Sequence, residues 1–246
     1  MCGRYALARP ASDLVRLFDA VEGPGLLESY QPSFNIGPTR HVAGLVTAAS
    51  GARLLEAYRW GLVPSGAVEL STGNRLFNAR AETLEERPVF AGLLERRRVA
   101  VVADGFYEWT PGPGDRRPRP YYFRRPDGEP LFFAGLWDAW HPPARSADVA
   151  SGPLLSCTII TTAAGEDMAG IHDRMPAILP PDCLEGWLQP RPLSRLDRES
   201  LLRPAPAGTL VHHPVDPRVG DVREDDAGLV ARFAAPPEPE PLTLFG

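Results

Sequence analysis

The apolar residues of this chain gather in short runs rich in β-branched and aromatic side chains, and this pattern limits the fold more than any other feature. Such runs are typical of buried strands, because helices usually need roughly ten residues or more. The runs do not alternate regularly with helical segments, so a parallel sheet built from βαβ units is not expected. The 28 prolines indicate many loops. We predict an α+β fold, a single β-rich domain with barrel-like antiparallel sheets flanked by short helices.

The clearest predicted strand is Val99–Trp109, an apolar run that is too short for a helix. A hairpin is predicted where the turn Pro126–Gly128 separates Tyr121–Arg125 from Leu131–Trp140. Further strands are expected at His41–Thr47, Leu54–Leu62 and Leu154–Thr162, and loops or turns at Tyr30–Thr39, Thr110–Pro120 and His141–Pro153.

Helical periodicity is confined to short segments. Ser12–Val21 follows a Ser cap, and an amphipathic helix over Val89–Arg98 ends in three arginines, which suit a helix C-terminus. Ala81–Arg87 begins as a helix that Pro88 interrupts. Two more short helices are expected at Pro181–Leu188 and Ser194–Leu202.

Composition predicts a soluble, cytoplasmic protein without a disulfide framework. Cys2, Cys157 and Cys183 include no Cys-x-x-Cys spacing, which favours a reducing compartment. No signal peptide is seen, and no apolar segment approaches the ~18 residues of a membrane span. Residues 234–246, rich in Pro and Glu, are predicted to be a disordered tail behind a domain spanning residues 2–233.

The net charge of −5 does not indicate a polyanion partner by itself. Residues 221–246 contain six acidic residues and two arginines, so −4 of this charge lies in the C-terminal stretch. The rest of the chain is nearly neutral, which leaves room for a local basic groove.

Cys2 is the residue with the most distinctive chemistry. Aminopeptidases remove Met1 when the next side chain is small, and a terminal Cys2 would carry an amine and a thiol on adjacent carbons. This 1,2-aminothiol can condense with an aldehyde and close to a thiazolidine. The chain contains no lysine, so any Schiff base must use the α-amine. With a pKa of about 7.8, against about 10.4 for lysine, much more of that amine is neutral near pH 7.

Two further segments place polar groups among apolar residues. Asn78 and Arg80 precede a predicted helix and could bind an anion or a sugar, although Asn78 could equally be an ordinary N-cap. Glu108, flanked by aromatic residues at the end of a predicted strand, could have a raised pKa and act as an acid–base group. The alternative for Glu108 is a side chain that faces solvent.

A third segment contains His172 and Arg174. His172 can titrate near neutrality and Arg174 can grip a phosphate, although a bond from His172 to neighbouring Asp173 would explain the histidine equally well. Trp60, beside Gly and Pro, could form a shelf on which bases stack. The histidines and cysteines have no recognised metal spacing, so no metal or cofactor is expected.

Six motifs occur together in one order: MCGRY, NIGPT, RWGLVP, NARAET, DGFYEW and GIHDRMPAIL. In this the chain resembles the SRAP family, the SOS-response-associated peptidases, which are understood as sensors of abasic sites in single-stranded DNA. The resemblance runs from Cys2 to about Pro181 and more loosely through Val211–Arg223. Each motif alone is weak, but six in the same order are highly specific.

The resemblance implies a covalent mechanism with four catalytic residues. After Met1 is removed, the Cys2 amine would attack the C1′ aldehyde of a ring-opened abasic sugar, and the thiol would close a thiazolidine crosslink. Asn78 would orient the sugar and the amine. Glu108 and His172 match the acid–base residues of the family, with no division of steps between them.

The resemblance also implies a DNA-binding set. Arg80 and Arg174 match phosphate-gripping positions, with Arg4 assisting, and Pro38 and Trp60 would wedge or stack the flanking bases. Members often carry a second Trp just after the RWGLVP stretch, whereas this chain reads Pro64–Ala67, so its stacking platform is expected to be smaller. The implied partner is single-stranded DNA containing abasic sites, bound by a monomer associated with a bacterial nucleoid.

Two other functions use the same terminal cysteine. Glutamine amidotransferases of the N-terminal-nucleophile class also begin Met-Cys-Gly, but their glutamine-binding motifs are not found here. A self-processing peptidase, which would release Met1 itself, differs little in its residues, and a lyase side reaction is compatible with the same set. A DNA-damage scaffold that has lost the chemistry is disfavoured because Cys2, Asn78, Glu108 and His172 are all present.

Overall fold

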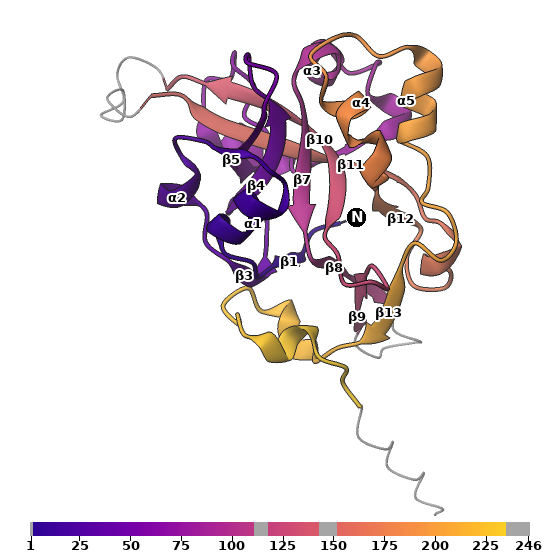
Figure 1. Ribbon diagram of the computed structural model, residues 1–246. Coiled ribbons are helices and arrows are strands. Elements are labelled where there is room, and N and C mark those ends of the chain that lie inside the picture. The colour runs from indigo at the N-terminus through magenta and orange to yellow at the C-terminus, as the bar shows by residue number, and fades with distance from the viewer. Residues whose placement is uncertain (1, 111–117, 143–151, 235–246) are drawn as a thin grey trace, which may run out of the picture.

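Five strands form a closed barrel at the centre of the computed structural model, which describes residues 2–110, 118–142 and 152–234 (Figure 1). The barrel strands are β4 (His41–Thr47), β5 (Arg53–Trp60), β7 (Arg98–Ala103), β10 (Leu131–Trp140) and β11 (Leu154–Ala163). Neighbours pair antiparallel, except that β11 pairs parallel with β5 and thereby closes the ring.

A second, antiparallel sheet lies below the barrel in the view of Figure 1 and has the strand order β13-β9-β8-β1-β3. It contains β1 (Tyr5–Leu7), β3 (Ser33–Ile36), β8 (Gly105–Thr110), β9 (Arg119–Arg124) and β13 (Val211–Pro214). The predicted α+β class, β-rich and barrel-like with short helices, is confirmed. The predicted tail lies outside the described residues from 235 onward, as do 111–117 and 143–151 of the two predicted loops.

Three short strands and several helices complete the fold. β2 (Val21–Glu22) pairs with β5, while β6 (Asn78–Arg80) and β12 (Arg174–Pro176) both pair with β11. The helices are α1 (Ala11–Leu17), α2 (Leu26–Ser29), α3 (Pro88–Arg96), α4 (Leu184–Leu188) and α5 (Arg195–Leu201). Short 3-10 helices lie at Leu70–Arg75, Ala81–Thr83, Glu166–Met168, Pro181–Cys183, Pro217–Gly220 and Ala227–Val230. Among the described residues, no helix has the length and apolarity that crossing a bilayer requires.

The run predicted as one strand, Val99–Trp109, is two strands in different sheets. β7 ends at Ala103 in the barrel and β8 begins at Gly105 in the second sheet. Asp104 fixes the break, because its carboxylate accepts hydrogen bonds from Ala8 N (2.8 Å) and Arg9 Nε (2.7 Å). A side chain at Gly105 would collide with the carbonyl oxygen of Phe123. The prediction of a single strand was wrong because these contacts come from distant residues.

The predicted hairpin also divides between the sheets. β9 pairs with β8 and β13, whereas β10 pairs with β7 and β11. The turn itself is present, with Gly128 in the left-handed region at φ 77°. A turn signal reports a local change of direction and does not determine which strands pair.

The helices differ from prediction at their ends. α1 begins at Ala11 behind Pro10 and stops at Leu17, because Asp19 is left-handed (φ 48°) and Val21 enters β2. Pro88 is the first residue of α3, a position where proline is favoured, so it starts a helix instead of interrupting one. Arg98 is the buried first residue of β7, not a helix terminus. Ser194 does cap α5, accepting from Asp197 N.

Gly61, directly after β5, provides a stability test of the close approach between its backbone and that of Gly73. It has φ 129°, and a Cβ there would lie 2.6 Å from the carbonyl oxygen of Gly73. Gly61→Ala should therefore destabilise the protein by about 2 kcal/mol or more, measured by urea unfolding. Gly66→Ala is the matched control, because nothing lies within 4 Å of its Cβ. Equal unfolding midpoints for the two variants would show that the structure does not require glycine at position 61.

Candidate active site

The pairing of β1 with β8 brings the start of the chain into the protein interior. Tyr5 is opposite Phe106, and Tyr107 N donates to Arg4 O at 2.9 Å, so the same register continued places Gly3 opposite Glu108. Cys2 is fully buried. Burial raises the pKa of the Cys2 thiol, and the negative charge of Glu108 raises it further, so the thiol is protonated at neutral pH.

Asn78 holds the backbone of Cys2. It lies on β6 opposite Ile159 of β11, and its Nδ2 donates to Cys2 O at 2.6 Å. Its Oδ1 is buried and accepts no hydrogen bond from the described residues. Because Asn78 is in a strand and caps no helix, the N-cap alternative is wrong. The amide instead joins the chain terminus to β11 and leaves one acceptor available at the site.

Glu108 faces the interior and not the solvent, with 3% of its surface exposed. Burial raises its pKa, although neighbouring positive charge, including that of His172, acts in the opposite direction by less. Its Oε2 lies 3.8 Å from His172 Nε2. This separation is longer than a direct hydrogen bond but close enough for a strong electrostatic interaction.

The tautomer of His172 follows from its backbone contact. Nδ1 accepts from the backbone N–H of Arg174 at 2.9 Å, so in the neutral ring the proton is on Nε2, the atom that faces Glu108. Asp173 Oδ1 lies 3.1 Å from Nδ1, and this carboxylate is mostly exposed. His172 thus contacts Asp173 through Nδ1 and faces Glu108 through Nε2, so the contact with Asp173 does not exclude a role for His172 at the candidate site.

Arg80 and Arg174 flank the same end of β11. Arg80 is exposed at the end of β6 opposite Thr161, and Arg174 begins β12 opposite Ala163. The Arg174 guanidinium donates to both carboxylate oxygens of Glu82, at 2.6 and 3.0 Å, and to Thr161 O at 2.7 Å. Glu82 is a residue that sequence reasoning missed, although it lies within the NARAET motif.

Trp60 does not form a shelf for bases. Its ring is fully buried against Tyr5, with ring centroids 5.3 Å apart, and its Nε1 donates to Phe77 O at 2.8 Å. The prediction was wrong because the adjacent Gly61 and Pro64 do not expose the ring. Pro38 is half-buried, and its contact with DNA stays a prediction.

Arg4 has a structural contact that the sequence did not indicate. Its Nη1 donates to Asn35 Oδ1 at 2.8 Å and to Val219 O at 2.7 Å. Asn35 is itself buried, and its Nδ2 reaches Asp221 O (3.0 Å) and Glu224 O (2.7 Å). These groups join β1 and β3 to the C-terminal segment, so assistance of Arg4 in DNA binding stays a prediction.

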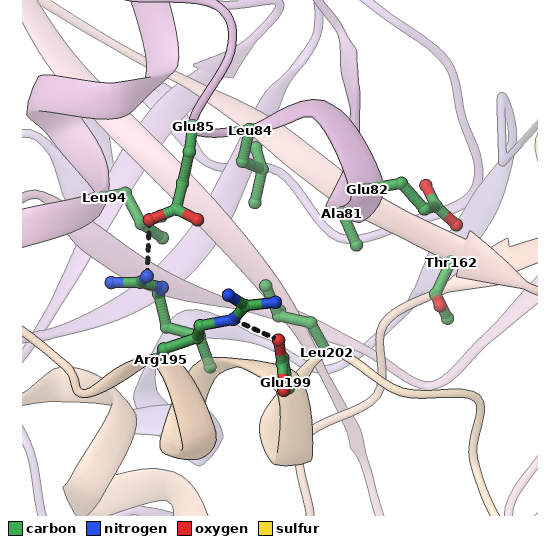
Figure 2. Close-up of a pocket in the computed structure, with 10 residues that line it drawn as sticks. Ala81, Glu82, Leu84, Glu85, Leu94, Thr162, Arg195, Glu199 and Leu202 are labelled. Atoms are coloured by element: carbon green, nitrogen blue, oxygen red, sulfur yellow. Dashed lines mark hydrogen bonds and ion pairs between the residues drawn. The ribbon is translucent and has the colours of Figure 1, made fainter.

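A separate pocket of about 430 Å³ lies between the Ala81–Thr83 turn and α5 (Figure 2). None of Cys2, Asn78, Glu108 and His172 lines it. Glu82 and Thr162 are on its wall, next to the Arg174 contacts. Among all the described residues, including those of the pocket, no group of three His, Cys, Asp or Glu side chains is arranged to hold a metal ion.

The arrangement of the terminal cysteine, amide, carboxyl and imidazole can be compared with known proteins. The family model described as "SOS response associated peptidase (SRAP)" matches residues 1–222. The chain belongs to the SRAP family. Among similar proteins of the family, the abasic site processing protein YoaM of Bacillus subtilis (strain 168) is 34% identical over 94% of this chain and 97% of its own. The abasic site processing protein HMCES of Gallus gallus is 34% identical over 92% of this chain and 76% of its own.

Solved structures agree on the fold. A crystal structure of a Bacteroides thetaiotaomicron protein superimposes with a TM-score of 0.82 at 21% identity, covering 95% of this SRAP chain and 100% of the other. A Bordetella bronchiseptica protein superimposes with a TM-score of 0.70 at 26% identity, covering 87% and 100%.

Removing the Arg4 guanidinium should loosen the C-terminal segment of this SRAP domain. Arg4→Ala leaves Asn35 Oδ1 without its donor and leaves Val219 O only the longer bond from Asn35 Nδ2 at 3.3 Å, so we expect a loss of about 2 kcal/mol in unfolding free energy. Hydrogen exchange should accelerate within residues 216–226. Arg223→Ala is the control, because that side chain is largely exposed and pairs with Asp221 on the surface. Unchanged exchange in Arg4→Ala would refute the link.

The buried carboxyl predicts a pH-dependent stability. The folded-state pKa of Glu108 lies above its unfolded value of about 4.5, so folding binds protons and its contribution to stability falls as pH rises from about 4 toward the raised pKa. Glu108→Gln should therefore be more stable than wild type at pH 7, with the difference shrinking toward pH 4. Thermal unfolding at both pH values measures it. Glu95→Gln, at an exposed position, should show no such trend.

Proposed function

We propose that this SRAP protein processes abasic sites in single-stranded DNA by forming a covalent thiazolidine crosslink through Cys2 after Met1 is removed. The observation that carries the proposal is the position of Cys2, whose carbonyl is held by Asn78 and whose thiol lies in the field of Glu108. The relatives named as abasic site processing proteins support the choice of substrate.

The chemistry needs a neutral amine and a group that moves protons. The Cys2 amine adds to the C1′ aldehyde to give a carbinolamine, whose hydroxyl leaves as water when it receives a proton. The Cys2 sulfur then bonds to the imine carbon, its proton is lost, and the nitrogen gains one. The net change is condensation with loss of one water, so no oxidant or cofactor is required.

Glu108 and His172 have the properties that these proton transfers require. A carboxyl with a raised pKa can protonate the departing hydroxyl and then, as a carboxylate, accept the proton of the thiol. This second step matters because the buried thiol is not ionised beforehand. His172, with Nε2 directed at Glu108, stabilises the carboxylate between the two steps.

DNA would approach from the end of β11 where Arg80 and Arg174 lie. Both would bind phosphates, and Pro38 would contact a flanking base. We propose a monomer that binds undamaged single strands weakly and with strong salt dependence, since phosphate contacts carry no information about the lesion. Self-processing of Met1 and a lyase side reaction belong to the same proposal and use the same residues.

The Cys2 thiol and amine are tested by one gel. Protein lacking Met1, verified by mass spectrometry, is mixed with a single strand containing one abasic site, and a heat-resistant band of lower mobility is expected. Cys2→Ala should abolish that band, a loss of at least about 100-fold. Cys183→Ala should retain it, because Cys183 lies in a 3-10 turn far along the chain.

Two controls separate the proposal from its rivals. A strand whose abasic aldehyde has been reduced to an alcohol should give no band, because the amine has nothing to condense with. A variant that keeps a residue before Cys2 should also be inert. Absence of an adduct with processed wild-type protein, together with hydrolysis of glutamine, would favour an amidotransferase-like hydrolase instead.

A further inference from the structure

The guanidinium proposed to bind a phosphate is already bound to an anion within the protein. Arg174 donates one hydrogen bond to each carboxylate oxygen of Glu82. A carboxylate and a phosphate present paired oxygens to arginine in the same fork geometry. The Glu82 carboxylate therefore uses the Arg174 donors that the proposed function assigns to a DNA phosphate.

The two partners differ in how firmly they are held. The Arg174 side chain is 15% exposed, and its Nη2 also donates to Thr161 O and Thr161 Oγ1, which fix it against β11. The Glu82 side chain is 50% exposed and lies on the short Ala81–Thr83 turn. An incoming anion could thus displace Glu82 while Arg174 keeps its position.

The charge on Glu82 is maintained at neutral pH. The hydrogen bond from Arg174 lowers the pKa of Glu82, and the positive charge of Arg80 adds a smaller effect in the same direction. In Figure 2 the Glu82 carboxylate points away from Arg195 and from Glu85 across the pocket. Glu85 pairs instead with Arg198, and Arg195 pairs with Glu199.

We propose that Glu82 is a specificity-determining residue, an internal anion that occupies Arg174 in the free protein and that a DNA phosphate must displace. The inference rests on the proposed function. Displacing the Glu82 carboxylate from Arg174 costs free energy each time the protein binds DNA. An undamaged strand has only phosphate contacts to offset that loss, whereas an abasic strand also forms the covalent bond to Cys2. Glu82 therefore weakens binding to undamaged strands while leaving capture of the lesion efficient.

The test compares Glu82→Gln with wild type for binding to an undamaged oligonucleotide. Without the competing carboxylate, affinity should rise about three- to tenfold, since one charge-assisted pair no longer has to be broken. The slope of log K against log salt should stay near that of wild type, because the same phosphate binds Arg174 in both complexes and only the cost of displacing Glu82 is removed. In crosslinking assays, undamaged competitor DNA should inhibit the variant at correspondingly lower concentration.

Glu85→Gln is the matched control. It removes the same charge from the same pocket and frees Arg198, whose exposure resembles that of Arg174. Its affinity and salt slope should stay near those of wild type. An equal gain in both variants would overturn the inference, because it would reflect net charge alone.

A double-mutant cycle separates competition from a structural role. In an Arg174→Gln background, Glu82→Gln should change affinity by less than about twofold, since there is no guanidinium left to release. A fall in affinity for Glu82→Gln, with its melting temperature unchanged, would show that Glu82 supports Arg174 and would overturn the inference. Failure of wild type to crosslink any abasic strand would instead refute the proposed function.

Discussion

The pairing of β11 with its neighbours is the interaction on which the rest of the structure depends. Its parallel pairing with β5 closes the barrel, and both β6 and β12 pair with its C-terminal half. Through these two short strands, one element fixes Asn78, Arg80 and Arg174. His172 lies two residues before Arg174, so the same strand also sets the place of the imidazole. A barrel strand thus gives the site rigidity that loops alone would lack.

The site places ionisable groups where burial opposes ionisation. Cys2 and Glu108 both have raised pKa values because they are removed from water. For the carboxyl, this costs stability at neutral pH, and under the proposed function it favours the protonated form that donates a proton. For the thiol, it suppresses premature reaction, because the thiolate is the reactive form. Both effects agree with the proposed order, in which the amine reacts first and the sulfur second.

The sequence predicted the class of fold and the main catalytic candidates, but not the contacts that come from distant segments. The β character of Val99–Trp109 was correct, whereas its division at Asp104 depends on Ala8 and Arg9. Trp60 was expected at the surface from its Gly and Pro neighbours, and packing on Tyr5 buries it. The order of the motifs did identify Cys2, Asn78, Glu108 and His172 as candidates. A family resemblance matches positions along the chain, so it could name these residues but could not predict the burial of Trp60.

The pairing of Arg174 with Glu82 shows why charge counts say little about DNA binding here. The two residues are 92 positions apart, and each alone would suggest the opposite conclusion about affinity for a polyanion. A protein that captures its substrate covalently gains little from tight binding before the reaction, because the bond itself supplies retention. It gains more from leaving undamaged strands quickly, since these far outnumber lesions. Under the proposed function, a nearly neutral body whose two candidate phosphate-binding arginines are Arg80 and Arg174, the second held by Glu82, is consistent with that requirement.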